Sequence, residues 1–109
     1  MIEPFSIYTS YISWDSGGKI RPVLVYALDD DIVKIYPITT QYENKSESVK
    51  VKYFKIKDWS QAGLEKKSYV DTGTRMKQSL SIFINLKRVG TLTESDKTRL
   101  LEFLSVRKK

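Results

Sequence analysis

The sequence contains neither cysteine nor histidine. Without cysteine, disulfides, thiolate nucleophiles and cysteine-ligated zinc are excluded. Without histidine, the chain lacks the usual general base near neutral pH and the commonest ligand of transition metals. The carboxylates form no obvious cluster for a divalent ion. Any catalysis by this chain must therefore use other side chains, and we expect it to work without a metal ion or other cofactor.

Long apolar runs are also absent. No stretch approaches the roughly 20 apolar residues needed to cross a bilayer, and Met1 to Pro4 lacks the basic and apolar regions of a signal peptide. We therefore expect a cytoplasmic protein that is not associated with a membrane. The chain has 109 residues, 40% of them hydrophobic, which suits one packed core. Residues 1-109 are predicted to form a single domain.

Acidic residues are outnumbered by basic ones. The 19 Lys and Arg residues exceed the 13 Asp and Glu residues, which gives a formal net charge of +6. A positive field of this size favours polyanions such as nucleic acid. Charge alone does not distinguish this interpretation from a simpler one, in which the charge only keeps a small protein soluble.

The clearest strand signal is the aliphatic run from Ile20 to Leu28, which predicts a central strand buried on both faces. Pro22 cannot donate a hydrogen bond to a neighbouring strand, so we expect it at the start of this strand or on an edge. The acidic run Asp29–Asp31 predicts a turn, and Ile32 to Thr40 then pairs with the first strand as a hairpin. Pro37 indicates a break or bulge near the end of the second strand.

The middle of the chain has weaker signals. Residues 43–48 are polar and predict a mobile loop. Val49 to Ile56 alternates apolar residues with lysines, which predicts a third long strand containing a one-residue bulge. Three further predictions are a helical turn at 59–64, a short strand at 68–70 and an alternating strand at 80–86.

A helix is predicted at the C-terminal end. Thr93 offers an N-cap hydroxyl, acidic residues follow in the first turn, and an apolar stripe contains Leu100, Leu101, Phe103 and Leu104. Several short strands and one terminal amphipathic helix predict a mainly β, α+β fold. We expect a small antiparallel β-barrel with the C-terminal helix packed across it.

Two segments carry candidate chemistry. Arg21 stands at the start of the predicted central strand, where a fixed guanidinium suits stabilisation of a phosphoryl transition state. Thr39 stands at the end of the hairpin partner, so an antiparallel pairing would bring the two side chains to one rim of the sheet. Taken alone, each has a commoner interpretation: a surface arginine paired with a carboxylate, and a threonine bonded to its own backbone turn.

Together these segments resemble the motifs of the MazF/PemK family of toxin–antitoxin ribonucleases. Members share a Gly-x-Arg-Pro-x-x-Val strand, which Gly18 to Val25 matches with one extra residue between glycine and arginine. They also share a Pro-x-Thr-Thr-Gln strand end, which Pro37 to Gln41 matches closely and in the right order. Weaker agreement extends to the final helix. Members usually carry a longer loop before the arginine than residues 14–18 provide here.

The resemblance implies an SH3-like barrel with a C-terminal helix, of the type found in MazF, CcdB and Kid. It implies metal-free cleavage of single-stranded RNA, in which the 2′-hydroxyl attacks the adjacent phosphorus and leaves 2′,3′-cyclic phosphate and 5′-hydroxyl ends. Arg21 would take the acid/base and phosphate-stabilising role, and Thr39 would help to hold the phosphate. Lys19, Thr40 and Gln41 would contact the nucleic acid. A homodimer and a cognate antitoxin protein are further implications.

Two alternatives stay open. A CcdB-like gyrase poison would use the same barrel, but those proteins end in a short apolar segment containing an aromatic residue, whereas this chain ends in residues 105–109, Ser-Val-Arg-Lys-Lys. That difference argues for RNA. A non-catalytic barrel that only binds nucleic acid would carry the same charges.

The later position that some family members use for an Arg-x-Asp pair holds Tyr69-Val70-Asp71 here, which makes Asp71 a candidate for proton transfer.

Overall fold

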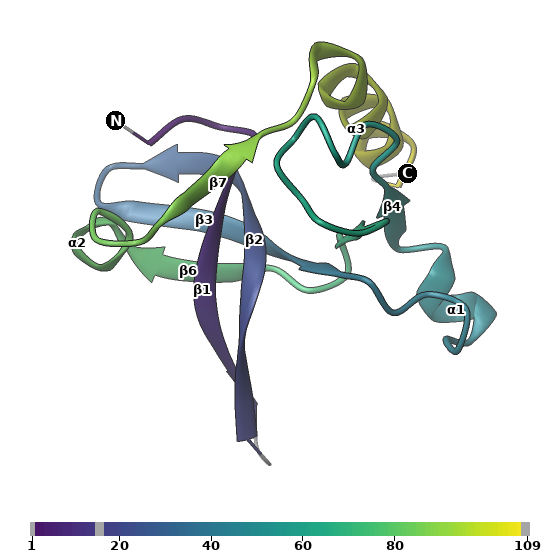
Figure 1. The fold of residues 1–109 in the computed structure, drawn as a ribbon, viewed down its shortest axis with the longest axis horizontal. Coiled ribbons are helices and arrows are strands. Elements are labelled where there is room, and N and C mark those ends of the chain that lie inside the picture. The colour runs from purple at the N-terminus through teal and green to yellow at the C-terminus, as the bar shows by residue number, and fades with distance from the viewer. Residues whose placement is uncertain (1, 15–16, 108–109) are drawn as a thin grey trace.

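The computed structural model describes residues 2–14 and 17–107, which contain seven strands and three helices. Along the chain the elements are β1 (Ser6–Trp14), β2 (Gly17–Asp29), β3 (Ile32–Thr39), α1 (Glu47–Lys50), β4 (Tyr53–Lys55), β5 (Tyr69–Asp71), β6 (Met76–Ser79), α2 (Leu80–Phe83), β7 (Arg88–Thr91) and α3 (Glu94–Arg107). Figure 1 shows their arrangement. None of the described helices has the length and apolar content that crossing a membrane requires.

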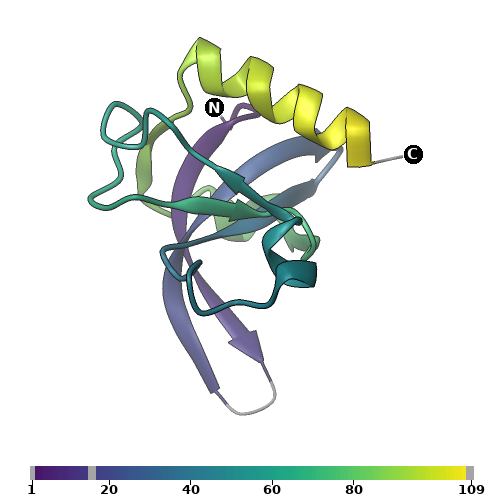
Figure 2. The same cartoon turned by 90° about the vertical axis from the view of Figure 1, so that its right-hand side faces the viewer.

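The strands form one antiparallel sheet in the order β4-β5-β3-β2-β1-β7, and β6 pairs with β3 beside this path. Helix α3 lies across the strands (Figure 2). The predicted combination of a mainly antiparallel sheet with a C-terminal helix is confirmed at this level.

The predicted central strand and hairpin are confirmed, but burial on both faces holds only for Val23–Val25, since Ile20 and Leu28 at the ends of the predicted run are exposed. Strand β2 lies between β1 and β3, and the pair Asp29 and Ile32 closes the hairpin around a turn in which Asp30 has a φ of 53°. Val23, Leu24 and Val25 are each fully buried. Because successive side chains of a strand point to opposite faces, three consecutive buried residues mean that this stretch is covered on both faces.

Two clusters of buried side chains provide this cover. Leu24 belongs to the cluster that also contains Ile38, Phe54 and Leu100, which lies on the side of β4, β5 and α3. Val23 and Val25 belong to the second cluster, on the side of β6 and α2. Strand β1 contributes in the same way, with Ile7 in the first cluster and Tyr8 in the second. The three strands β1, β2 and β3 therefore separate two apolar layers.

Pro22 and Pro37 lie where strands change neighbours. Strand β3 pairs with β6 through Ile35, and from Ile38 onwards it pairs with β5, so Pro37 lies close to the change. The irregularity expected near Pro37 is thus a change of partner, whereas the register shift of the hairpin lies in β2, between Val25 and Ala27. Pro22 lies one residue beyond Val23, the last β2 residue paired with β3. Pro22 therefore lies inside β2 and not at its start as expected, paired with Thr9 of β1 on one side and beyond the described pairs with β3 on the other.

The prediction of a third long strand over 49–56 is wrong, and so is that of a loop throughout 43–48. Helix α1 occupies Glu47–Lys50, and only Tyr53–Lys55 forms a strand. The pairing partner explains this difference. Strand β5 is three residues long, and the next backbone N–H, of Thr72, donates to the carbonyl of Lys52. No described strand faces Val49, so its alternation with lysine has nothing to pair with.

The alternating strand predicted over 80–86 is also wrong. Residues Leu80–Phe83 form α2, and the Ile84 N–H donates to the Leu80 carbonyl as the turn continues. Phe83 is fully buried, whereas Ile82 and Ile84 are exposed. A short apolar run fits either a strand or a helical turn by periodicity alone. The strands here are β6 before this segment and β7 after it.

Helix α3 begins as predicted. The Thr93 hydroxyl accepts a hydrogen bond from the Asp96 N–H at 3.3 Å and donates to the Asp58 carboxylate at 2.8 Å. Leu100 is fully buried against the sheet, and Phe103 and Leu104 pack at the margin of the same cluster. Leu101 is the exception within the predicted stripe, since it is exposed. The helical turn predicted for 59–64 is confirmed by the Ala62 N–H bonded to the Asp58 carbonyl.

Candidate functional site

A depression of about 200 Å³ lies where β2 and β3 separate. The five residues that the sequence singles out as a site all line it: Lys19, Arg21, Thr39, Thr40 and Gln41. We call this hollow the Arg21 depression. It collects two cations from β2 and, from the end of β3 and the two residues after it, two hydroxyls and an amide; the two segments are 18 or more residues apart in the sequence.

The register of the hairpin explains why Arg21 and Thr39 lie together. Val23 pairs with Pro37, so continuing this register for two residues brings Arg21 opposite Thr39. Arg21 is partly exposed, and Thr39 is 8% exposed. The arrangement therefore offers a charged donor at the opening and a hydroxyl at the wall.

The Thr39 hydroxyl accepts a hydrogen bond from the Gln41 backbone N–H at 3.0 Å. This is the local turn bond that the simpler interpretation of the threonine expects. A hydroxyl also has a donor proton and a second lone pair, so this bond leaves it able to donate. The turn bond therefore fixes the Thr39 oxygen in place and is compatible with a contact to a phosphate oxygen.

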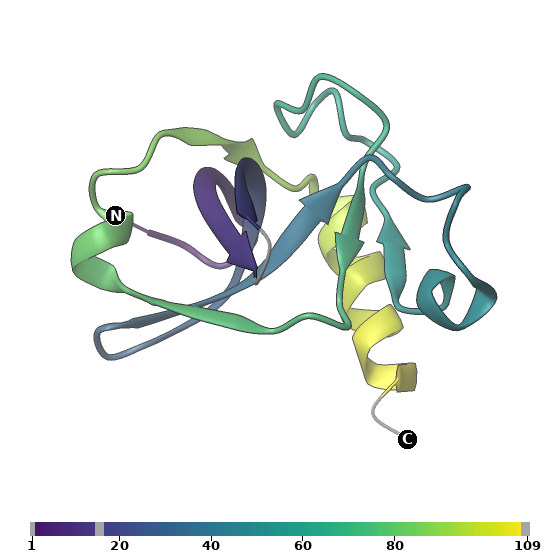
Figure 3. The same ribbon diagram turned by 90° about the horizontal axis from the view of Figure 1, so that it is seen from below.

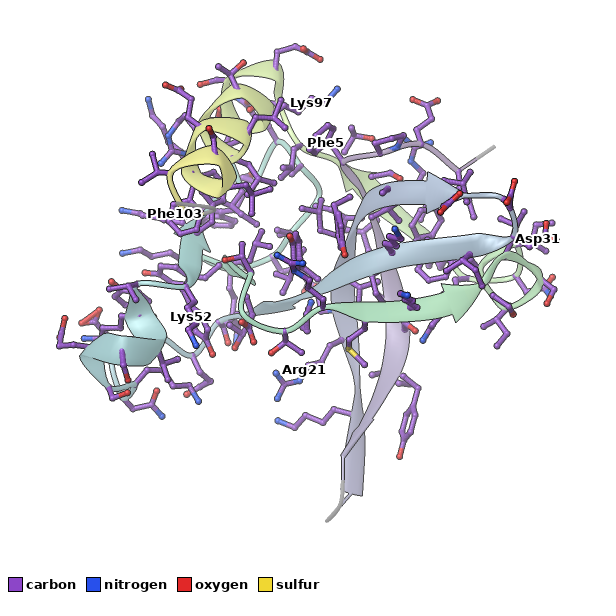
Figure 4. All side chains as sticks on the ribbon, turned by 180° about the vertical axis from the view of Figure 1, so that it is seen from behind. Phe5, Arg21, Asp31, Lys52, Lys97 and Phe103 are labelled. Atoms are coloured by element: carbon purple, nitrogen blue, oxygen red, sulfur yellow. The ribbon has the colours of Figure 1, made fainter. Side chains whose placement is uncertain are left out.

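Beyond the hairpin, β1 and β2 continue as a two-stranded ribbon. The pairing runs from Thr9 opposite Pro22 to Trp14 opposite Gly17. Figure 2 shows the ribbon projecting from the body of the molecule, and Figure 3 shows it from its tip. Figure 4 shows Arg21 leaving the ribbon on the side of α1 and β4. The short segment before Arg21 is thus part of an extended hairpin arm.

Tyr53 lies within electrostatic range of Arg21, which the sequence did not indicate. Burial raises the pKa of the Tyr53 phenol, the Asp71 carboxylate raises it further, and the Arg21 charge lowers it. Tyr53 and Asp71 are cross-strand partners of β4 and β5. At neutral pH the phenol therefore keeps its proton and can donate a hydrogen bond.

The Asp71 carboxylate is held by its own turn. It accepts hydrogen bonds from the Gly73 N–H at 3.0 Å and from the Thr74 hydroxyl at 2.8 Å. Asp71 does not line the Arg21 depression. The structure thus gives this carboxylate a part in shaping the turn after β5 and an electrostatic effect on Tyr53.

A cluster of tyrosines includes Tyr42, Tyr53 and Tyr69, two of which are sequence neighbours of residues that line the depression. Tyr42 follows Gln41 directly, and its ring stacks on that of Tyr69 with centroids 4.4 Å apart and planes 8° apart. The Tyr53 ring lies 6.3 Å from Tyr42, and the Lys50 ammonium lies 5.0 Å from the Tyr42 centroid. The residues come from four separate segments, so spacing along the sequence carried no signal for the cluster.

Within residues 2–14 and 17–107, no group of three or more acidic residues is placed to hold a metal ion. In comparisons with known proteins, the chain matches no protein-family model and no curated protein. Interpretation of the site therefore depends on the residues of the Arg21 depression themselves.

Proposed function

We propose that this protein is a metal-independent endoribonuclease that cleaves single-stranded RNA, acting as the toxin of a type II toxin–antitoxin module. The observation that carries the proposal is the Arg21 depression, in which all five candidate site residues from the two sequence motifs gather. The net charge of +6 supports a polyanionic substrate. An SH3-like barrel of the MazF, CcdB and Kid type is part of the same proposal.

The chemistry follows from the groups present. The substrate's own 2′-hydroxyl is already beside the phosphorus, so its attack gains from proximity and needs no activated water. A bond forms between the 2′-oxygen and phosphorus, and the bond from phosphorus to the 5′-oxygen breaks. The proton lost from the 2′-hydroxyl passes to a base, and the departing 5′-oxygen gains a proton. The products are a 2′,3′-cyclic phosphate and a free 5′-hydroxyl.

Arg21 and Thr39 have separate parts in this step. The Arg21 guanidinium binds the phosphate oxygens through charge-assisted hydrogen bonds and stabilises the charge that develops on them. It also assists the departing 5′-oxygen. The Thr39 hydroxyl donates to a phosphate oxygen from its fixed position on the wall. Lys19, Thr40 and Gln41 hold the flanking strand, since they line the same hollow.

Two partners complete the proposal: a second copy of the chain, giving a homodimer with RNA across both subunits, and a cognate antitoxin protein that silences it.

The alternatives are a gyrase poison of the CcdB type and a barrel that binds nucleic acid without cutting it. The position of a guanidinium and a hydroxyl in one hollow favours binding of a phosphate over a gyrase poison. A barrel that only binds RNA would use the same two groups, so the cleavage assay separates it from a nuclease.

Cleavage of a long single-stranded RNA by the purified protein is the test. We expect Arg21→Ala to lower the rate at least about a hundredfold, since a positioned charged donor is removed from the transition state. Arg75→Ala is the matched control, because Arg75 is an exposed arginine that does not line the depression. Equal rates for the folded Arg21→Ala variant and the wild type would contradict the assignment.

The product ends test the nucleophile. RNA fragments should carry a 5′-hydroxyl that a kinase labels directly, and a substrate with a 2′-deoxy nucleotide on the 5′ side of the cut should bind without being cut. Fragments with 5′-phosphate ends would show that water is the nucleophile. Binding without cleavage of any RNA would favour the non-catalytic barrel, and inhibition of gyrase in place of both would favour the poison.

A further inference from the structure

A second and larger hollow adjoins the Arg21 depression. Its volume is about 500 Å³, within the range of pockets that hold small ligands, and it lies between the ribbon, β7 and residues 63–68. Pro22, Thr40 and Ser68 line both hollows. We call the larger one the β7 groove. A strand lying in the depression can pass over these shared residues directly into the groove.

The lining of the groove is basic. Lys66, Lys87 and Arg88 line it, against one carboxylate, that of Glu65. All four side chains are exposed, so their charged ends can meet a ligand without first leaving a buried site. A polyanion held at Arg21 would therefore find further cations along one side of its path.

The wall of the groove is held closely in place. A Cβ atom on Gly63 would lie 2.3 Å from the Val89 carbonyl oxygen, and one on Gly90 would lie 2.1 Å from the Ala62 carbonyl oxygen. Gly63 also has a φ of 92°, which glycine adopts without strain. The loop and β7 thus touch backbone to backbone. The groove between them and the ribbon is part of the folded structure and needs no ligand to shape it.

An exposed aromatic residue stands beyond the groove on the ribbon. Thr9 and Pro22, which line the groove, are cross-strand partners, and the next pair on the same face is Tyr11 with Ile20. Tyr11 is 59% exposed and Ile20 is 74% exposed. Ile20 also lines the Arg21 depression. An apolar surface with an aromatic ring therefore borders the cations, a combination that suits an unpaired base beside its phosphate.

We propose that the β7 groove is a binding subsite for the nucleotide next to the cleaved phosphate of a single-stranded RNA. Lys66 and Lys87 contact its phosphate, and its base stacks on Tyr11. The subsite extends the Arg21 depression, so it rests on the proposed function. It also defines the path of the bound strand, because the RNA would run from Arg21 across Pro22 and Thr40 towards β7.

Binding of an RNA that cannot be cut tests the subsite separately from cleavage. The probe is a fluorescent 2′-O-methyl oligoribonucleotide of about 12 nucleotides, followed by anisotropy. The test variant is Lys66→Ala/Lys87→Ala. The control variant is Lys34→Ala/Lys77→Ala, which removes the same charge from a β3–β6 pair that lines neither hollow.

We expect the groove variant to bind about tenfold more weakly at about 0.1 M salt. The slope of log K against log salt should become shallower by about 0.7, because both lysines contact the phosphate of one nucleotide and each neutralised phosphate of a single strand contributes about 0.7. The control variant should change affinity less than about threefold, because its lysines line neither hollow and salt screens charges that do not touch the strand. Equal losses in the two variants, or no loss in either, would overturn the subsite.

Tyr11 provides a second arm. Tyr11→Phe should bind as the wild type does, and Tyr11→Leu should bind at least about fivefold more weakly, because only the first keeps a stacking ring. A similar loss in both variants would refute stacking. If the groove variants behave as expected and no RNA is cut, the subsite stands and the nuclease assignment fails. If RNA is cut and the groove and control variants match, the nuclease stands and the subsite fails.

Discussion

Of the acidic residues in the first turn of α3, Asp96 is predicted to lower the stability of the fold most when it is replaced by alanine. Its side chain is fully buried, and one carboxylate oxygen accepts the Lys57 N–H at 3.2 Å while the other accepts the Asp58 N–H at 2.8 Å. The first oxygen also pairs with Arg99. Asp96→Ala removes the acceptor of both backbone groups at once and leaves the guanidinium without this carboxylate.

The expected cost follows from these bonds. Hydrogen bonds to a charged acceptor contribute about 1.5–3 kcal/mol each, and we take the lower value because Lys57 and Asp58 are partly reached by water. The loss is therefore about 3 kcal/mol, a large part of the 5–15 kcal/mol typical of a domain. With a urea m-value near 1.5 kcal/mol/M, the unfolding midpoint should fall by about 2 M.

Urea unfolding followed by circular dichroism measures this change, and Glu94→Ala is the matched control. Glu94 is also acidic and also in the first turn of α3, but its side chain is 89% exposed and pairs with Lys97 on the surface of the same helix. Its removal should cost less than about 1 kcal/mol. If the two variants lose similar stability, the Asp96 carboxylate does not hold the loop at 57–58 to the helix, and the reasoning fails.

Three further predictions concern the site. Thr39→Ala should lower RNA cleavage more than Thr40→Ala, because Thr39 is fixed on the wall of the depression; greater sensitivity of Thr40 would shift the assignment by one residue. Cleavage should survive excess EDTA, and a loss reversed by magnesium would direct attention to Asp29–Asp31. Folding raises the pKa of the Tyr53 phenol above its ordinary value of 10.0. The contribution of the protonated phenol to stability is therefore fully present below pH 10.0, and it is lost as the pH rises through the pKa of the folded state. Unfolding in urea from pH 9 to 11 should therefore depend less on pH in Tyr53→Phe; parallel curves would show that Tyr53 does not titrate in this way.

Local signals predicted the elements whose partners are close in sequence. The β2–β3 hairpin has its turn residues beside it, and α3 carries its own cap at Thr93. The predictions for 49–56 and 80–86 were wrong for the opposite reason. The secondary structure of these segments depends on partners that are distant in the sequence. Strand β5 is too short to pair with Val49, and Phe83 is buried in the core while the neighbouring isoleucines are exposed.

The same division holds for the site. The placement of Arg21 and Thr39 in one hollow could be predicted because one hairpin joins their strands. The effect of Arg21 on Tyr53 and the basic lining of the β7 groove could not. Lys66 lies in the loop at 63–68 and Lys87 directly precedes β7. The loop and β7 pack together through Gly63 and Gly90, and nothing in the local sequence around either glycine indicates this contact.

The layer formed by β1, β2 and β3 has a consequence for unfolding. Both apolar clusters take side chains from all three strands, with Leu24 on one side and Val23 and Val25 on the other. Neither cluster can lose its packing without separating strands that the other needs. The two halves of the core should therefore melt together in one cooperative transition, and the slowest-exchanging amides should be those of the β2–β3 hairpin, directly beside the Arg21 depression.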